Sequence, residues 1–361
     1  MFNVSMRARV QRAIAIAAAA SMMAACSEDE KLGTGPDGEI PEAAINEIVV
    51  SPALNASSSD TLVYFSFRTG GLVPRTGDWD LALRRFELRL NSPAIAGASS
   101  RNVTGFSLDN NETATDAEVL AFTPANQLTA FDNIRAAQIP DADAFSSDDL
   151  AEDPQGYLLF GGVPRANTAL YWKAKLANGA FALFRVASIN FTQTFQVSSL
   201  VIESRLQNGN TLGPVRTLTI IPNSQVTAIS LVTNTTVTAE GCNWDLRFDP
   251  ATSALSLETN AACNVGTYPG PSSPTFQAAT SASDAPQYVP YLSQLVGPIP
   301  NSTEDERGPF RYNLAGNQRL HPTFNTYLVK SGTRVYKVQV IDYYNQTGTA
   351  GFPTLRYARI Q

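Results

Sequence analysis

The chain has 361 residues, of which 43% are hydrophobic and 16% are charged. This composition is typical of a globular protein, and the length suggests two modules, although one large all-β domain also fits. The formal net charge of −6 provides no basic field, which excludes a nucleic-acid partner.

The first residues direct the protein to export. A positive segment, MRARVQR (6–12), precedes a run of small apolar residues that is too short to span a membrane. The sequence MAAC (23–26) resembles the lipobox of bacterial lipoproteins. This resemblance implies a lipoprotein signal peptide over 1–25 and a lipid on Cys26, which would anchor the chain in a membrane. The alternative is an ordinary signal peptide with a chance cysteine.

The residues after the lipobox predict the final location. Ser27 replaces the aspartate that signals inner-membrane retention, and EDE (28–30) resembles the export tags of surface lipoproteins. We therefore expect a bacterial outer-membrane lipoprotein exposed at the cell surface, although this charge could serve solvation alone. Residues 26–44 are predicted to form a flexible acidic tether.

The remaining chain has the pattern of an all-β protein. Short runs of period-two alternation are separated by clusters of Gly, Pro, Asn, Ser and Thr. Near the end, segments 336–345 and 352–361 predict a half-buried hairpin, with Tyr336 and Val338 on the buried face. Lys337 and Gln339 fall on its other face.

Two parts of the chain are similar to each other. DWDL (78–81) and NWDL (243–246) each follow an apolar run, and segment 171–207 matches 327–361. These matches predict a tandem duplication, with antiparallel β domains over 45–208 and 212–361. The alternative is one domain split by a long insertion near 150–300.

The two Trp-Asp-Leu motifs also predict local structure. The apolar positions change phase at Arg84-Arg85, which predicts a β-bulge after the first motif. After the second, DPATSA (249–254) predicts a turn, and Cys242 and Cys263 flank this hairpin. In an exported chain such a pair predicts a disulfide, worth roughly 3 kcal/mol. A metal or redox site is the alternative.

Two blocks of sequence resemble the HmuY family. Residues 64–92 (YFSFRTGGLVPRTGDWDLALRRFELRLNS) are similar to its opening signature, and residues 312–360 to its Tyr-rich ending. The resemblance implies an all-β fold of two tandem HmuY-like antiparallel β domains after a lipoprotein signal peptide. It also implies a bacterial surface lipoprotein, and some members of the family bind heme for iron acquisition.

The residues limit how heme could be held. Characterised members ligate iron with two His or Met side chains, whereas the mature chain has no Met and one histidine, His321. His–His and His–Met ligation within one molecule are therefore excluded. His321 alone, His321 with a tyrosine, His321 from two protomers, or no ligation remain. Tyr343 and Tyr344 are candidate ligand-binding residues, with ordinary sheet aromatics and an ordinary loop histidine before Pro322 as the alternatives.

The expected function is non-enzymatic ligand binding of the HmuY type. His321 has no G-x-S-x-G motif, P-loop or zinc-ligand spacing around it, so we do not expect an enzyme. The expected ligand is heme or another small apolar molecule. The alternative is a surface interaction or adhesion module that binds a protein or a glycan.

Overall fold

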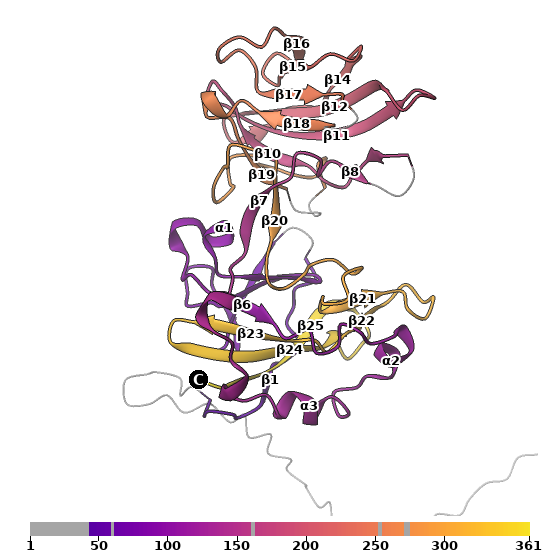
Figure 1. Ribbon diagram of the computed structural model, residues 1–361. Helices are drawn as coiled ribbons and strands as arrows, with labels where there is room; N and C mark the ends of the chain where they lie inside the picture. Colours follow the sequence, from indigo (N-terminus) through magenta and orange to yellow (C-terminus); the bar gives the residue numbers. More distant parts are fainter. Residues whose placement is uncertain (1–42, 59–60, 160–162, 252–254, 271–274) are drawn as a thin grey trace, which may run out of the picture. The chain divides into compact units, whose positions relative to one another are not determined.

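The computed structural model describes residues 43–361 except 59–60, 160–162, 252–254 and 271–274 (Figure 1). Contacts group Glu42–Gln361 as one unit. The predicted signal peptide, Cys26 and nearly all of the tether lie outside the described residues. Within the described residues, no helix has the length and apolar character needed to cross a membrane.

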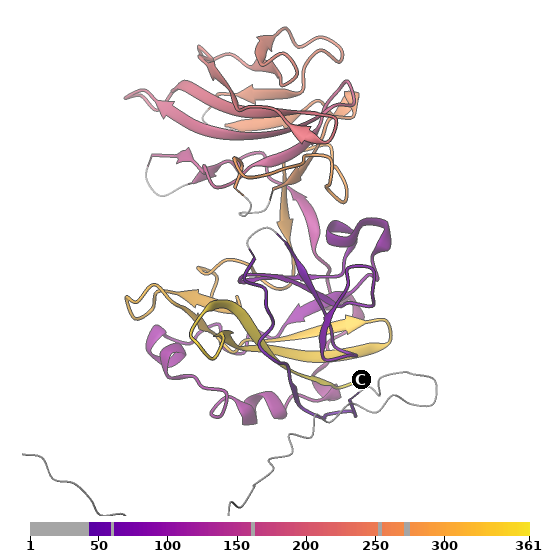
Figure 2. The same ribbon diagram turned by 180° about the vertical axis from the view of Figure 1, so that it is seen from behind.

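A five-stranded antiparallel sheet contains the chain end and confirms the predicted closing hairpin. Its strands, in spatial order, are β1 (Val49–Val50), β25 (Ala350–Arg359), β24 (Arg334–Tyr344), β23 (Thr326–Ser331) and β6 (Thr104–Ser107). A four-stranded sheet packs against it, in the order β3 (Gly71–Val73), β2 (Val63–Ser66), β4 (Leu81–Arg84) and β5 (Glu87–Leu90). Figure 2 shows the two sheets in indigo and yellow.

The predicted bulge at Arg84-Arg85 is wrong. β4 and β5 form a tight hairpin in which Arg84 pairs with Glu87, and Arg85 lies in the turn with φ of 52°. The phase of the apolar positions changes because the chain reverses there. A non-glycine residue with this positive φ is uncommon outside turns.

A second pair of sheets is formed by residues from the middle of the chain. The larger one has the order β13 (Thr211–Leu212), β12 (Val197–Asn208), β11 (Phe181–Phe191), β10 (Trp172–Lys175) and β19 (Gly266–Pro269), and β14 (Arg216–Ile220) also pairs with β12. The smaller one has the order β16 (Thr235–Val237), β15 (Thr227–Ser230), β17 (Leu246–Asp249) and β18 (Ser256–Thr259).

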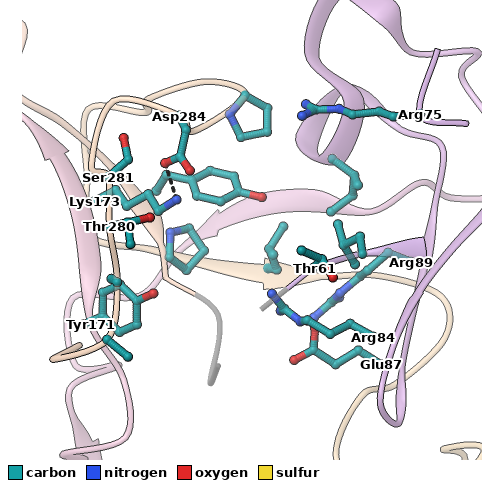
Figure 3. A pocket seen from close by; sticks show the side chains of 18 of the residues that line it. Thr61, Arg75, Arg84, Glu87, Arg89, Tyr171, Lys173, Thr280, Ser281 and Asp284 are labelled. Carbon is teal, nitrogen blue, oxygen red and sulfur yellow. Dashed lines mark hydrogen bonds and ion pairs between the residues drawn. The ribbon is translucent and has the colours of Figure 1, made fainter. Parts of the chain in front are cut away.

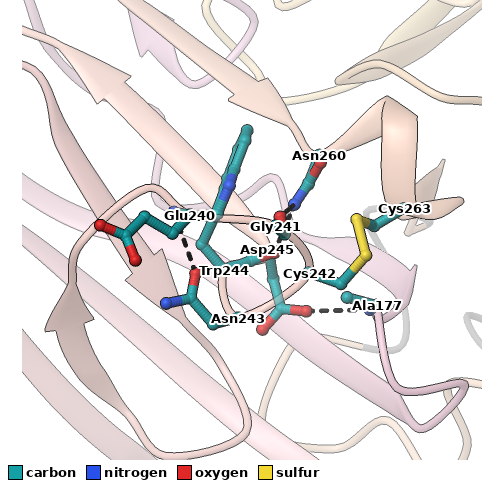
Figure 4. Close-up of a disulfide and its surroundings, with 9 residues drawn as sticks. All are labelled: Ala177, Glu240, Gly241, Cys242, Asn243, Trp244, Asp245, Asn260 and Cys263. Carbon is teal, nitrogen blue, oxygen red and sulfur yellow. Dashed lines mark hydrogen bonds between the residues drawn. A yellow bond between two sulfur atoms is a disulfide. The ribbon is translucent and has the colours of Figure 1, made fainter.

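The predicted disulfide and the turn after the second Trp-Asp-Leu motif are part of this smaller sheet. Cys242 and Cys263 are joined, with their Cα atoms 5.5 Å apart (Figure 4). β17 and β18 pair as the hairpin that the sequence predicts. The disulfide therefore links the segment before β17 to the short helix after β18.

Short ladders and helices complete the chain. The ladders are β7 (Asp149–Glu152) with β20 (Ser293–Val296), β8 (Leu158–Leu159) with β9 (Arg165–Ala166), and β21 (Phe310–Tyr312) with β22 (Leu320–Pro322). The α-helices are α1 (Pro93–Ala96), α2 (Asp116–Ala121) and α3 (Leu128–Asp132). The 3₁₀ helices are Gly97–Ser99, Ala136–Gln138, Ala142–Ala144 and Ala261–Cys263.

Each pair of sheets encloses its own hydrophobic core. One core joins residues such as Phe65 and Leu83 to Tyr327 and Val338. The other lies entirely between residues 157 and 292 and includes Trp172, Phe184 and Phe248. The all-β class is therefore confirmed, and the chain forms two sheet pairs, one from the middle of the sequence and one from the segments on either side of it.

The closing hairpin is more buried than its alternation predicts. Lys337 and Gln339 are 0% and 1% exposed, so β24 is covered on both faces. The segment around α3 covers the outer face, because the Lys337 Nζ donates to the backbone oxygen of Phe131 at 2.8 Å. The expectation of a half-buried hairpin is wrong, since a polar residue on a strand does not require solvent on that face.

Candidate functional site

A cavity of about 590 Å³ is lined by side chains from both sheet pairs (Figure 3). Arg84, Glu87 and Arg89 reach it from the β4–β5 hairpin. Lys173 of β10 and Asp284 come from the other sheet pair. A neighbouring cavity of about 1010 Å³ shares the β4–β5 residues. The hairpin therefore separates two hollows with a common charged wall.

The β4–β5 hairpin places its charged side chains on the cavity wall because its apolar ones fill the core. Leu83, Leu88 and Leu90 are fully buried, so the residues that alternate with them face away from the core. Arg84 and Glu87 pair at 2.6 Å, and Arg89 lies 3.5 Å from the carboxylate of Asp148.

Positive charge dominates the smaller cavity. Its lining contains four cations, Arg75, Arg84, Arg89 and Lys173, against the carboxylates of Glu87 and Asp284. Lys173 forms an ion pair with Asp284. The lining side chains thus carry two more positive than negative charges, of which the one on Arg89 is paired with Asp148, in a chain whose net charge is −6. Such a cavity favours a ligand with negative groups.

Tyrosines supply the apolar part of the lining. Tyr64 packs against Trp79 with ring centroids 4.8 Å apart, and Tyr268 donates its hydroxyl to the backbone oxygen of Ala94 at 3.1 Å. Burial raises the pKa of Tyr268 to about 12, partly offset by Arg89, and burial also raises the pKa of Tyr64. Both phenols are therefore neutral at physiological pH, and they offer aromatic surface and hydroxyl groups.

The structure places His321 in a strand instead of the predicted loop. In β22 it pairs with Arg311 of β21. The imidazole is half-buried, and its Nε2 atom is buried without a hydrogen-bond partner among the described residues. Burial, together with the Arg319 charge, lowers the pKa of His321. The imidazole is therefore neutral at pH 7, which is the form that ligates metal.

Tyr343 and Tyr344 lie beside the strand that holds His321. The hydroxyl of Tyr344 accepts a hydrogen bond from the backbone N–H of Leu320 at 3.0 Å, and the Arg319 guanidinium lies 4.0 Å from the Tyr344 ring centroid. Tyr343 is buried against Phe310, with ring centroids 5.1 Å apart. The three predicted residues therefore share one neighbourhood, but none of them lines either of the two cavities described above.

Sequence reasoning did not identify the cationic cavity. Its residues come from segments more than a hundred positions apart, such as Arg75 and Asp284, and only the tertiary fold brings them together. One local signal was available. Arg84, Glu87 and Arg89 alternate with leucines in the hairpin, which predicts charged side chains on the face that points away from the core.

A comparison with models of protein families identifies one family for most of the chain. The model of the HmuY protein family matches residues 58–357. An apo HmuY analog of Tannerella forsythia is 9% identical, with a TM-score of 0.31, over 88% of this chain and 98% of the other. A Bacteroides vulgatus protein described as HmuY-like and heme-binding is 14% identical, with a TM-score of 0.15, over 47% and 96%. No curated protein matches the chain.

Proposed function

Because the chain belongs to the HmuY family, we propose that it is a non-enzymatic ligand-binding lipoprotein, anchored in the outer membrane through Cys26 and exposed at the cell surface. The proposed ligand is a flat apolar molecule that carries carboxylates. Heme is the first candidate, since some members of the family bind it.

The positive charge of the smaller cavity is the observation that carries this proposal. Heme carries two carboxylates on an apolar ring. Arginine and lysine bind such groups through charge-assisted hydrogen bonds, and tyrosine rings provide apolar surface for the macrocycle. Arg75, Lys173 and Tyr64 line the same cavity, so they offer both kinds of contact.

Iron ligation by His321 is a separate proposal. The neutral imidazole with a buried, unpartnered Nε2 has the right chemistry. However, His321 does not line either described cavity, so a heme held in the cationic cavity would bind without it. Ligation by His321 would place heme at the β21–β22 hairpin, beside Tyr344.

Titration with ferric heme and with iron-free protoporphyrin tests the two modes. Protoporphyrin has the same carboxylates and no iron, so carboxylate binding in the cavity predicts saturable binding of both. The double variant Arg75→Gln/Lys173→Gln is expected to weaken both about tenfold, equivalent to about 1.4 kcal/mol. Arg165→Gln, an exposed arginine of β9 that does not line the cavities, is the matched control and should bind as the parent does.

Binding that depends on the iron would contradict heme binding in the cationic cavity. If only ferric heme binds, and His321→Ala abolishes its Soret shift while the double variant does not, then heme is held through iron at His321. Failure of both ligands to bind at micromolar concentration would reject heme capture and favour the interaction module.

A further inference from the structure

The two four-stranded sheets have the same topology. Their spatial orders are β3-β2-β4-β5 and β16-β15-β17-β18, so the first, second, third and fourth strands along the chain take the same places in both. Both Trp-Asp-Leu motifs lead into the third strand. A chance similarity of short β segments would not reproduce both the order and the motif position.

The first motif has a specific hydrogen-bond network. The Asp80 N–H donates to the Phe65 oxygen at 2.8 Å, and the Phe67 N–H donates to Asp80 Oδ2 at 2.9 Å. The Asn91 N–H donates to the backbone oxygen of Asp80 at 3.0 Å. The Asn91 side-chain amide donates to the Trp79 oxygen at 2.9 Å.

The second motif repeats this network atom for atom. The Asp245 N–H donates to the Ile229 oxygen at 2.8 Å, and the Leu231 N–H donates to Asp245 Oδ2 at 2.8 Å. The Asn260 N–H donates to the backbone oxygen of Asp245 at 3.0 Å. The Asn260 side-chain amide donates to the Trp244 oxygen at 3.1 Å. The two four-stranded sheets are therefore equivalent at the level of single atoms.

The larger sheets are equivalent as well. Reading β14 in place of β13, their orders are β1-β25-β24-β23-β6 and β14-β12-β11-β10-β19. β23 pairs with β6 from Tyr327, opposite Ser107, to Lys330, opposite Thr104. β10 pairs with β19 in the matching way, from Trp172, opposite Pro269, to Lys175, opposite Gly266. Both long hairpins also have an irregularity at the matching place, after Val340 and after Val186.

The chain connectivity, however, does not follow the repeats, because each large sheet combines strands from both of them. Strands β1–β6 come from the first half of the chain, but they are completed by β23–β25 from the end. Strands β14–β19 lie in the predicted second repeat, 212–361, but they are completed by β10–β12 from the predicted first repeat, 45–208. The motif carboxylates show the same crossing. Asp80 Oδ1 accepts from the Ser331 hydroxyl at 2.7 Å, and Asp245 Oδ1 accepts from the Ala177 N–H at 3.0 Å (Figure 4).

We infer that the chain is a tandem duplication, over 45–208 and 212–361, in which the two copies have exchanged their C-terminal strand triplets, β10–β12 and β23–β25. Each copy supplies the strands that complete the sheets of the other. Such an exchange preserves every equivalent contact and changes only the connecting segments, which is why domain swapping costs little. A simple insertion near 150–300 would also place β10–β19 between the two parts of the first sheet pair. It would not explain why the strands of the two sheet pairs have the same order and the same pairing registers.

The exchange has a consequence for a protein exposed to proteases. The exposed turn at Gly209–Asn210 lies between the copies, directly after β12. A cut there leaves each fragment hydrogen-bonded into the sheets of the other. The C-terminal fragment would therefore stay attached to the N-terminal one.

Cleavage at that turn provides the first test. In the chain lacking residues 1–26, a protease recognition sequence is inserted between Gly209 and Asn210. After complete cleavage, the two fragments should co-elute in size-exclusion chromatography and separate only in denaturant. Separate elution without denaturant would overturn the exchange.

A rearranged chain distinguishes the exchanged duplication from an insertion. Segments 172–206 and 327–359 trade places in the sequence, so that each half carries its own partner strands. If the copies are equivalent, this chain folds with the same circular dichroism spectrum. After cleavage, its fragments are no longer joined by the pairings of β23 with β6 and of β10 with β19, but they keep the β7–β20 ladder and contacts such as Leu88 with Asn301 and Tyr157 with Leu255. They should therefore separate at a lower urea concentration than the cleaved fragments of the original chain, and separation at an equal or higher concentration would contradict the inference.

Cysteine cross-linking keeps the exchange testable if the rearranged chain does not fold. In the original sequence, Thr104→Cys is combined with either Lys330→Cys or Lys175→Cys. The exchanged pairing predicts a disulfide only with position 330, since Lys330 is the register partner of Thr104. A cross-link between 104 and 175, detected by mass spectrometry, would show that the first copy completes its own sheet.

Discussion

At the scale of single residues, Lys337 and Asp148 illustrate charges held inside the protein. The Lys337 ammonium donates to three backbone oxygens at the end of α3, on Phe131, Asp132 and Ile134, at 2.8, 3.2 and 2.9 Å. Burial lowers its pKa to about 8, with the Arg135 charge contributing. Asp148 is also buried, and it accepts a hydrogen bond from the Leu90 N–H.

Replacing Lys337 by Met should destabilise the fold by about 3 kcal/mol, because buried oxygens lose their donor. It also removes the contact between the ammonium and the Phe131 ring, whose centroid is 4.6 Å away. Urea denaturation measures the loss. Lys330→Met, on the neighbouring strand and partly exposed, is the control and should cost less than 1 kcal/mol. Equal losses for both variants would contradict this role for Lys337.

The titration of Asp148 predicts a pH dependence of stability. Burial raises its pKa to about 6, although Arg89 partly offsets the effect. Between about pH 6 and 4 the folded protein binds a proton that the unfolded chain does not, so stability rises as the pH falls through this window. Relative to Asp148→Asn, which cannot titrate, the parent should gain up to about 3 kcal/mol. Urea midpoints at pH 7, 6, 5 and 4 measure the difference, and parallel curves would reject the assignment.

At the scale of elements, local pattern predicted hairpins well and their surroundings poorly. The alternation at 336–345 and 352–361 correctly indicated β24 and β25, because turn residues and period-two burial are local properties. The same alternation could not show that the segment around α3 covers Lys337, since that contact joins segments more than two hundred positions apart. The turn at Arg85 was missed because a phase change fits a bulge and a reversal equally well.

The disulfide between Cys242 and Cys263 links the two ends of the β17–β18 hairpin. The sequence separation is 21, and the loop-entropy argument gives about 3 kcal/mol for a closed loop of this size. The double variant Cys242→Ser/Cys263→Ser should lower the melting temperature by several degrees. The parent treated with reductant should lose the same amount, while the reduced variant should lose nothing further. A variant as stable as the parent would show that the clamp is dispensable.

At the scale of the whole molecule, positive residues gather at the smaller cavity although the net charge of the chain is negative. The chain carries −6 overall, yet four cations and two carboxylates line the smaller cavity, and Asp148 pairs with one of these cations, Arg89. Both sheet pairs contribute to this arrangement, since Lys173 lies on β10 while Arg84 and Arg89 lie on the β4–β5 hairpin. A carboxylate ligand would therefore meet side chains from both sheet pairs.

This distribution predicts a salt-dependent affinity. Raising the ionic strength from about 20 to about 200 mM shortens the range of electrostatic attraction, so protoporphyrin binding should weaken several-fold. The Arg75→Gln/Lys173→Gln variant should lose most of this salt dependence along with its affinity. Fluorescence titration at the two salt concentrations measures both. A parent affinity that does not change with salt would contradict carboxylate binding in the cavity.

The sequence by itself determined the β-strands, the closing hairpin, the disulfide and the HmuY family, because each of these depends on local alternation, on turn residues or on short motifs. Only the tertiary structure decided which hairpin completes which sheet. The segments 172–206 and 327–359 have the same pattern and the same pairing register. Local preferences therefore cannot choose between them. The structure shows the pairing that forms, with Asp80 bound to Ser331 and Asp245 bound to Ala177, and the cavity is lined as a result by Arg84 from one sheet pair and Lys173 from the other.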